Sequence, residues 1–363
     1  KPLDEDGRKR LIETWLERYR KDLPKEIKSR LIRADQSKTP LFLRVVLDEL
    51  RVSSKHEALE HDLNAFLQTN DLVELFARVL QNVEGDQAHG GALAREALSL
   101  IFASRMGLEE TELRELLGET NARHLAFLFA RMAEYLTRVD GRYGFLHDAL
   151  RQAVAKRYSL EGETLAALHR RLANYFEDFP LGQRQLDEYP WHLSRLEEWE
   201  RLRQWLGRLD VFREFHGRDQ SQFEFSVYWQ WLEGSLPMQN SLMMLEGYKN
   251  ELSSLDDADR RQTIVMFTNF CNQLLQGMQV DSGSLAKAGR LLEKDEPEVV
   301  ATQYVRPRWL QDRDDLDRAA KLFWEILKQI KGGRDPAVAT GMDNLAYVFL
   351  YQGRLEAAEE WFQ

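Results

Sequence analysis

The side chains that could do chemistry do not form a recognised catalytic signature. The 363 residues contain no Gly-x4-Gly-Lys-Ser/Thr segment, so the backbone cradle and the lysine that hold nucleotide phosphates are not encoded here. The patterns His-Glu-x-x-His and Gly-x-Ser-x-Gly are also missing from the sequence. His56 and His61 are five positions apart, which misaligns them on a helix for shared metal ligation. We therefore expect no catalytic residues, no metal site and no enzyme activity from this chain itself.

The acidic pairs and the single cysteine do not indicate a catalytic or metal site either. Asp256-Asp257 and Asp314-Asp315 are expected to be solvated turn or cap residues, because nothing nearby in the sequence suggests an apolar site that would shift their pKa values. Cys271 is the single cysteine, which excludes an intramolecular disulfide and a zinc site built mainly of thiolates. A chain without disulfides is expected in a reducing compartment, and we expect the protein to be cytoplasmic. Apolar runs such as 125–130 are far shorter than the roughly 20 residues that cross a bilayer, so no membrane span is expected.

Basic residues gather locally in a chain that is acidic overall. The net charge is −10, whereas residues 123–157 carry seven basic and three acidic side chains. Phosphate or nucleic-acid contacts are therefore assigned to five of these basic residues, Arg138, Arg142, Arg151, Lys156 and Arg157. The segment 121–135 contains LAFLFA at its centre, which leaves few polar side chains to read base edges. Sequence-specific DNA binding is not expected, and we favour a core or partner-facing role for this segment.

The elements that would position these residues are mainly helical. No glycine occurs between Arg8 and Glu84, and no proline occurs from Leu41 to Phe179, so long helices are unobstructed. Thr39-Pro40 predicts a helix start, since threonine can cap the helix and proline has no N–H to leave unpaired. Asp71 is the expected N-cap of a further amphipathic helix. We expect residues 1–89 to form a helical domain.

Residues 90–158 have a different pattern. Helices are expected at 92–105, 109–117 and 121–135, followed by a hairpin around Asp140-Gly141 and then a further helix. This order is typical of a winged helix-turn-helix domain with one small β-hairpin and a two-stranded wing.

The remainder is expected to be helical again. Residues 159–215 form a helical linker domain and residues 216–363 an α-solenoid of tetratricopeptide-like repeats. Five tryptophans in these segments are assigned to the core, namely Trp191, Trp199, Trp205, Trp229 and Trp231. The clearest repeat consists of Met342, Leu345, Ala346, Phe349, Gln352-Gly353, Leu355, Ala358 and Phe362. Earlier units are read at Leu316, Ala319 and Phe323, and at Leu285, Ala288 and Leu292. The overall fold class is thus mainly all-α.

Two further features concern the ends of the sequence. The chain starts without Met, and its last repeat stops at Gln363, inside the second helix of the repeat. Because stacked repeats bury their faces only against neighbours, we expect this sequence to be a piece of a longer protein with more repeats after Gln363.

The order of several segments resembles the carboxyl-terminal part of a STAND-class signalling ATPase. It is most similar to the nephrocystin-like and telomerase-associated branch, which has many bacterial members. The segments that carry the resemblance are TPLFLRVVLDELR (39–51), LVELFARVLQNVE (72–84), YGFLHDALRQAV (143–154), ALHRRLANYF (167–176) and YPWHLSRLEEWERLRQWL (189–206), before the repeats. The resemblance implies a helical lid over a nucleotide-binding domain, a winged helix and a repeat sensor.

Three nucleotide-binding residues follow from the resemblance. Pro40 and Leu41 match the family's Gly-x-Pro-Leu type lid motif, whose proline lies near the adenine, although Thr39 precedes the proline here. Helix initiation alone also explains Pro40. His147 matches the winged-helix histidine that reaches the diphosphate of bound ADP. Alternatively, His147 caps the following helix or packs into the hairpin.

The resemblance also implies a function for the parent protein. ATP or ADP would be its cofactor, a protein trigger would bind the repeats, and the nucleotide-binding and effector domains would lie outside this sequence. Activation would lead to homo-oligomers in signal transduction, including defence. Two alternatives remain open: a winged-helix transcription regulator with a repeat sensor, and a plain repeat scaffold without a switch.

Overall fold

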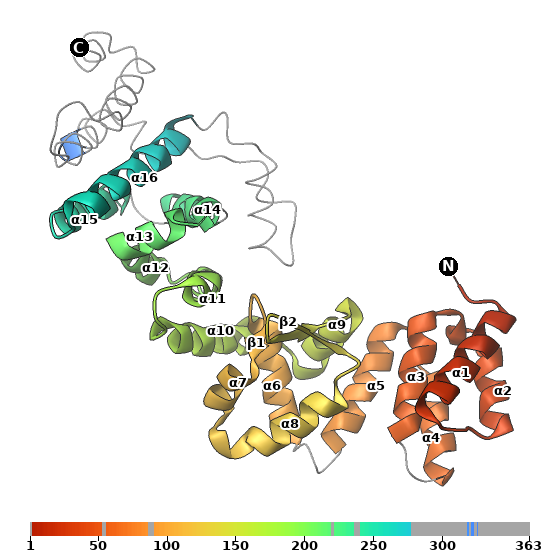
Figure 1. The fold of residues 1–363 in the computed structure, drawn as a ribbon. Coiled ribbons are helices and arrows are strands. Elements are labelled where there is room, and N and C mark those ends of the chain that lie inside the picture. The colour runs from red at the N-terminus through yellow and green to blue at the C-terminus, as the bar shows by residue number, and fades with distance from the viewer. Residues whose placement is uncertain are drawn as a thin grey trace. The chain divides into compact units, whose positions relative to one another are not determined.

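The computed structural model describes residues 2–276 except 53–55, 86–90, 219–220 and 236–239, together with Arg318, Lys321, Leu322 and Glu325. Its contacts divide the chain into two compact units, residues 1–168 and 169–363. Within the described residues each unit is built from helices, and one small sheet lies in the first unit (Figure 1). The prediction of a mainly all-α fold with a small β element is confirmed. No described helix has the length and apolar character needed to span a membrane.

Unit 1 begins with helices that surround a hydrophobic helix. The helices are α1 (Glu5–Tyr19), α2 (Lys25–Arg33), α3 (Pro40–Val52), α4 (His56–Leu67) and α5 (Leu72–Gly85). Helix α3 starts at Pro40 as predicted, and the Thr39 carbonyl accepts the Leu43 N–H at 3.2 Å. Asp71 caps α5 as predicted, because its carboxylate accepts the Glu74 N–H at 2.8 Å. Most of α3 is buried, as expected for a helix with so many apolar residues.

The rest of unit 1 joins helices to a three-stranded sheet. The elements are α6 (Gly91–Ala103), β1 (Leu108–Glu109), α7 (Glu110–Leu117), α8 (Ala122–Arg131), β2 (Leu136–Val139), β3 (Arg142–Phe145) and α9 (Asp148–Tyr158). The predicted hairpin is confirmed, with β2 and β3 antiparallel around Asp140 and Gly141. Both turn residues have positive φ, 50° and 83°, as a tight two-residue hairpin turn requires.

Three predictions for this region are wrong in detail. The expected two-stranded wing is a three-stranded sheet in the order β1-β3-β2, because Leu108 pairs with Tyr143. Glu109, expected as the first helical residue, is instead extended and forms a capping box with Glu112. The helix expected at 121–135 ends at Arg131, and a turn leads from there into β2. Neither glycine nor proline marks this end, so the sequence gives no stop signal.

The two halves of unit 1 are joined by extensive packing. Helix α5 packs along α9, and the rings of Phe76 and Tyr135 meet edge to face at 5.8 Å. Arg157 on α9 forms two hydrogen bonds with the Glu84 carboxylate on α5, at 2.7 and 2.5 Å. The boundary expected between residues 89 and 90 therefore falls inside one compact unit.

Unit 2 consists of helices that pack on their neighbours in chain order. Helix α10 (Gly162–Glu177) enters the unit at residue 169. It is followed by α11 (Gln183–Arg195), α12 (Trp199–Leu206), α13 (Leu209–His216), α14 (Ser221–Ser235), α15 (Asn240–Leu252) and α16 (Asp257–Gln276). Trp191, Trp205 and Trp229 are buried as predicted, whereas Trp199 and Trp231 are half-buried. Asp256 accepts the Asp259 N–H at 2.8 Å, which confirms its role as a cap.

The repeat predictions concern a part of the chain that the structure does not describe. Met342 to Phe362 and Leu285 to Leu292 lie outside the described residues, as do Leu316, Ala319 and Phe323. Asp314-Asp315 lies there as well.

Candidate functional site

A pocket of about 570 Å³ lies between α1 and α3 in unit 1. Helix α3 contributes Pro40 and Leu41, two of the residues predicted to bind nucleotide, together with Arg44. Helix α1 contributes the remaining lining residues Arg10, Leu11, Thr14, Trp15, Arg18 and Tyr19. The pocket therefore combines an apolar and aromatic wall with three guanidinium groups, a combination suited to an anion that also carries a flat ring.

The α1 side of this pocket has a regular basic stripe. Arg10, Thr14 and Arg18 follow one another at intervals of four residues, which places them on one face of the helix. Among the described residues, Arg10 has no ion-pair or hydrogen-bond partner. The Arg18 guanidinium lies 5.6 Å from the centre of the Tyr19 ring. This stripe was missed by the sequence analysis, although its spacing on a predicted helix was a usable signal.

Trp15, which lines the pocket, is hydrogen-bonded to a buried carboxylate. The Trp15 indole N–H donates to Asp48 at 3.2 Å, and Asp48 is 3% exposed. Burial raises the pKa of Asp48, and the nearby Glu134 carboxylate raises it further. Arg44 lies 3.9 Å from Asp48 and forms an ion pair with Glu134, which follows α8. Arg44 thus connects the pocket wall to the sheet-bearing half of unit 1.

A second acid on α3 makes a deeper connection between the two halves. The Glu49 carboxylate accepts hydrogen bonds from Arg131 at 2.6 and 2.7 Å and from the Tyr135 hydroxyl at 3.2 Å. The Asn82 amide on α5 donates to it at 3.2 Å. Burial, with the charge of Glu49, raises the pKa of Tyr135 well above its usual range, so the hydroxyl remains a donor. These contacts fix α3, α5 and the end of α8 to one another.

His147, the third residue predicted to bind nucleotide, lies at the start of α9. His147 is the N-cap residue of α9, as one alternative predicted, but its side chain makes no capping hydrogen bond. The ring stacks on Phe76 with centroids 6.1 Å apart and an interplanar angle of 28°. Burial and the positive charge of Arg44 lower the pKa of His147. Arg44 therefore lines the pocket of Pro40 and Leu41 and also acts electrostatically on His147.

The five basic residues assigned to phosphate or nucleic acid differ in their surroundings. Arg138 on β2 lies 5.3 Å from the Tyr143 ring, and Arg142 is half-buried on β3. On α9, Arg151 lies 4.7 Å from the Phe102 ring and Arg157 is held by Glu84. Lys156 is exposed on the same helix. Two of the three basic side chains on α9 are therefore engaged by neighbours within unit 1.

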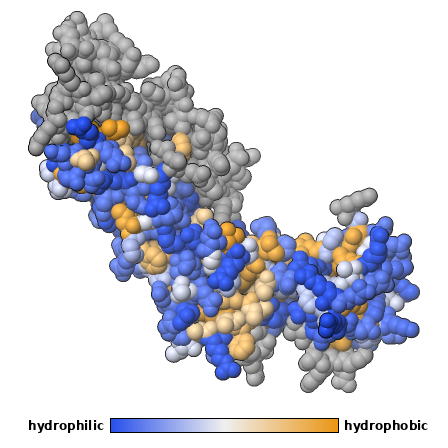
Figure 2. All heavy atoms as spheres, in the orientation of Figure 1, coloured by the Kyte–Doolittle hydropathy of each residue, from blue (hydrophilic) through white to orange (hydrophobic). Residues whose placement is uncertain are grey.

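Helix α8 exposes an apolar face. Leu125, Leu128 and Phe129 are buried, as predicted for a core helix. On the opposite side Phe127 is 42% exposed, and Figure 2 shows a hydrophobic area over this helix. Ala126 and Ala130 are also exposed on α8, and Ala133 is exposed in the turn after it. Such a surface offers contacts to another apolar surface and few hydrogen bonds to base edges.

Comparison with known proteins gives one distant relative. The chain is similar to a TPR repeat-containing protein of Dictyostelium discoideum, with 29% identity over 236 residues. The match covers 64% of this chain and 14% of that protein, so the chain spans a small part of its relative. No family model matches the chain, and no solved structure matches it.

Proposed function

We propose that this chain is the regulatory and sensor portion of a STAND-type signal-transduction NTPase. In this proposal unit 1 closes over ATP or ADP held by a P-loop domain outside the given sequence, and helical repeats bind a protein trigger. The observation that carries the proposal is the position of Arg44, which lines the pocket with Pro40 and Leu41 and is also, after burial, the second cause that lowers the pKa of His147.

The pocket, together with His147 outside its lining, offers groups suited to the parts of a nucleotide. Pro40, Leu41 and Trp15 offer apolar surface to a base, and Arg10 offers a guanidinium without a competing carboxylate among the described residues. The imidazole of His147 has no hydrogen-bond partner in the described part of the chain and can donate to a phosphate oxygen. ATP or ADP would supply the negative charge that these groups attract, and this chain's residues would orient it without catalysing its hydrolysis.

The element order supports the same proposal. From α6 to α9 the chain runs helix, strand, helix, helix, two hairpin strands and helix, which is the order of a winged helix-turn-helix domain. We propose that Arg44 exchanges its Glu134 partner for phosphate when nucleotide is bound. The buried contacts of Glu49 would then carry the change from α3 to α8 as one rigid connection.

A variant of His147 in the parent protein provides the test. His147→Ala removes a charge-assisted hydrogen bond worth about 1.5 to 3 kcal/mol, which selectively destabilises the nucleotide-closed state. We expect the variant to lose copurifying ADP and to signal without its trigger. A matched control, His61→Ala, changes an exposed histidine on α4 and should leave both measurements unchanged. A His147 variant that keeps its ADP and stays silent would overturn the proposed role.

The strongest second candidate is a protein-interaction scaffold without a nucleotide switch. The similarity to a TPR repeat-containing protein favours it, since stacked helical repeats present extended binding surfaces. In that case ADP would not change the protease sensitivity of the parent protein. A transcription regulator receives less support, because α8 exposes Phe127 and alanines where a recognition helix needs polar groups. Weak DNA binding that is lost between 50 and 200 mM salt would agree with phosphate contacts alone.

A further inference from the structure

The exposed residues of α8 form a continuous stripe along one side of the helix. Arg123, Ala126, Phe127 and Ala130 stand at positions i, i+3, i+4 and i+7, so they share one face. All four are exposed, and Phe127 is 42% exposed in spite of its size. The hydrophobic area over α8 in Figure 2 agrees with this stripe. We call these four residues the α8 face.

The side chains of the α8 face suit contact with another helix. Ala126 and Ala130 are one helical turn apart, and their short side chains let the backbone of a second helix approach closely. Phe127 projects beside them and can fit between the side chains of that helix, as ridges and grooves do when helices pack. An amphipathic helix with apolar residues at matching intervals would therefore cover all three residues.

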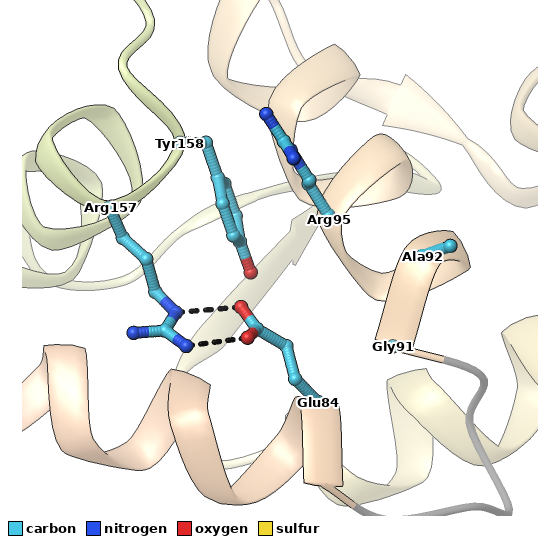
Figure 3. Close-up of a pocket in the computed structure, with 6 residues that line it drawn as sticks. All are labelled: Glu84, Gly91, Ala92, Arg95, Arg157 and Tyr158. Atoms are coloured by element: carbon cyan, nitrogen blue, oxygen red, sulfur yellow. Dashed lines mark hydrogen bonds and ion pairs between the residues drawn. The ribbon is translucent and has the colours of Figure 1, made fainter.

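Ion pairs neutralise several charges elsewhere in unit 1. Where α5 meets α9, the Glu84 carboxylate accepts two hydrogen bonds from Arg157, at 2.7 and 2.5 Å. The Tyr158 hydroxyl points toward the same carboxylate (Figure 3). Before α8, Arg114 forms an ion pair with Glu119 at 2.5 Å. The charges of these pairs are thus satisfied within the unit.

The start of α8 differs from its end in this respect. Arg131, at the end of α8, and Glu134, in the turn after it, each form an ion pair with a side chain of α3. Arg123 and His124 are exposed at the start of the helix, and neither forms an ion pair within the described residues. The Arg123 guanidinium lies 5.5 Å from the centre of the Phe127 ring. An unneutralised positive charge therefore lies directly beside the exposed aromatic ring.

We infer that the α8 face binds an acidic amphipathic helix of a partner protein. The apolar side of that helix would cover Phe127 and the two alanines, and its carboxylates would pair with Arg123 and accept a hydrogen bond from His124. Aromatic and arginine side chains together often dominate the affinity of an interface. The inference does not depend on the proposed function, because it uses a surface separate from the pocket between α1 and α3.

Nucleic acid and an anionic membrane fit the α8 face less well. Arg123 is the single arginine or lysine of the face, whereas tight binding to DNA needs several phosphate contacts and polar groups that reach base edges. Helices that lie on membranes carry several large apolar residues and rows of basic residues. Phe127 is the single large apolar residue of the α8 face, so a helix of complementary charge remains the best match.

Fluorescence anisotropy with the full 363-residue chain tests the inference. The probe is a labelled amphipathic peptide with leucines along one side of the helix and glutamates beside them. A control peptide has lysines in place of the glutamates. We expect micromolar binding of the glutamate peptide, because the face is small, and roughly tenfold weaker binding of the lysine peptide.

Variants with matched controls locate the binding surface. Phe127→Ser should weaken binding of the glutamate peptide roughly tenfold or more. Val265→Ser changes another exposed apolar residue, on α16, and should bind the peptide like the unmodified chain. Arg123→Glu should reverse the preference, so that the lysine peptide binds more tightly than the glutamate peptide. Lys156→Glu makes the same change of charge on α9 and should leave the preference as it is.

A further variant separates binding from folding. Ala130 is exposed and glutamate is a good helix former, so Ala130→Glu should keep the melting temperature while repelling the glutamate peptide. Absence of glutamate-peptide binding, or equal binding of the two peptides, would overturn the inference. Binding that Phe127→Ser and Ala130→Glu both leave unchanged would overturn it as well. Tighter binding of a DNA duplex or of phosphatidylserine vesicles at the same salt concentration would replace the helix by one of those ligands.

Discussion

The Arg131 guanidinium lies 2.6 Å from a carboxylate oxygen of Glu49, and the two side chains are only 10% and 2% exposed. This ion pair is the buried connection between α3 and the end of α8. Because both charges have left water, each depends on the other, and neither can be removed alone without leaving a buried charge unpaired.

Removal of one partner of this ion pair should therefore strongly destabilise unit 1. We expect Arg131→Met to lower the free energy of unfolding of unit 1 by about 3 to 5 kcal/mol, measured by urea unfolding. The double variant Glu49→Leu/Arg131→Met should recover much of this loss, since no unpaired charge remains. As a surface control, Arg114→Met breaks an exposed pair with Glu119 and should cost no more than about 1 kcal/mol. A loss at Arg131 as small as that at Arg114 would contradict the buried role.

The buried histidine pair in unit 2 predicts a dependence of stability on pH. His169 Nδ1 lies 3.0 Å from His192 Nδ1, and burial, with the charge of His192, lowers the pKa of His169 to about 3. The unfolded chain binds a proton near pH 6.5 that the folded chain resists, so stability falls as pH drops from about 6.5 toward 3. Protonation of His169 alone should lower the free energy of unfolding by about 2 kcal/mol between pH 7 and pH 5.

Charged groups around the pair also matter for that experiment. Glu188 lies 3.2 Å from His192 Nε2 and is bound by Arg184, while Arg195 acts on His169 by its charge. Buried His216, whose pKa is lowered to about 4, changes stability in the same direction. Urea unfolding of His169→Phe at pH 7 and pH 5 should show a smaller loss than the unmodified chain, with exposed His61→Phe as the control. An unchanged pH dependence in His169→Phe would refute the assignment.

The electrostatic link between Arg44 and His147 can be measured directly. Burial is the main cause that lowers the pKa of His147, and the Arg44 charge is the second. Arg44→Gln should therefore raise the pKa of His147, as followed by NMR titration of the imidazole. Arg10→Gln changes another arginine of the same pocket and serves as the control, because its charge is not among the causes of the shift. If Arg44→Gln leaves the pKa of His147 unchanged, the Arg44 charge does not act on His147 and the link is refuted.

Two glycines with similar backbone angles should respond differently to substitution. Gly107 and Gly141 have φ of 81° and 83°, so alanine is strained at both by roughly 1 to 2 kcal/mol. At Gly107 an added Cβ would also lie 2.4 Å from the Tyr143 carbonyl oxygen, whereas at Gly141 the space is open. Thermal unfolding should thus show a clearly larger loss for Gly107→Ala than for Gly141→Ala. Equal losses would mean that β1 does not approach β3 closely.

The sequence predicted helices well because their signals are local. The prolines, the Asp71 cap and the apolar stripes depend on neighbours within a few positions. Strand β1 has only two residues, and its partner Tyr143 is distant in sequence, so no local pattern could indicate it. For the site, Pro40 and His147 came from motif resemblance, whereas Arg44 became significant only through its contacts with Asp48 and Glu134.

The hydrogen bond from Trp15 to Asp48 gives unit 1 a natural optical reporter. Of the nine tryptophans in the sequence, Trp15 alone precedes residue 169. Its indole lines the pocket between α1 and α3 and points its N–H at a buried acid. The difference in emission between the unmodified chain and Trp15→Phe therefore isolates one fluorophore inside the candidate site, without an added label.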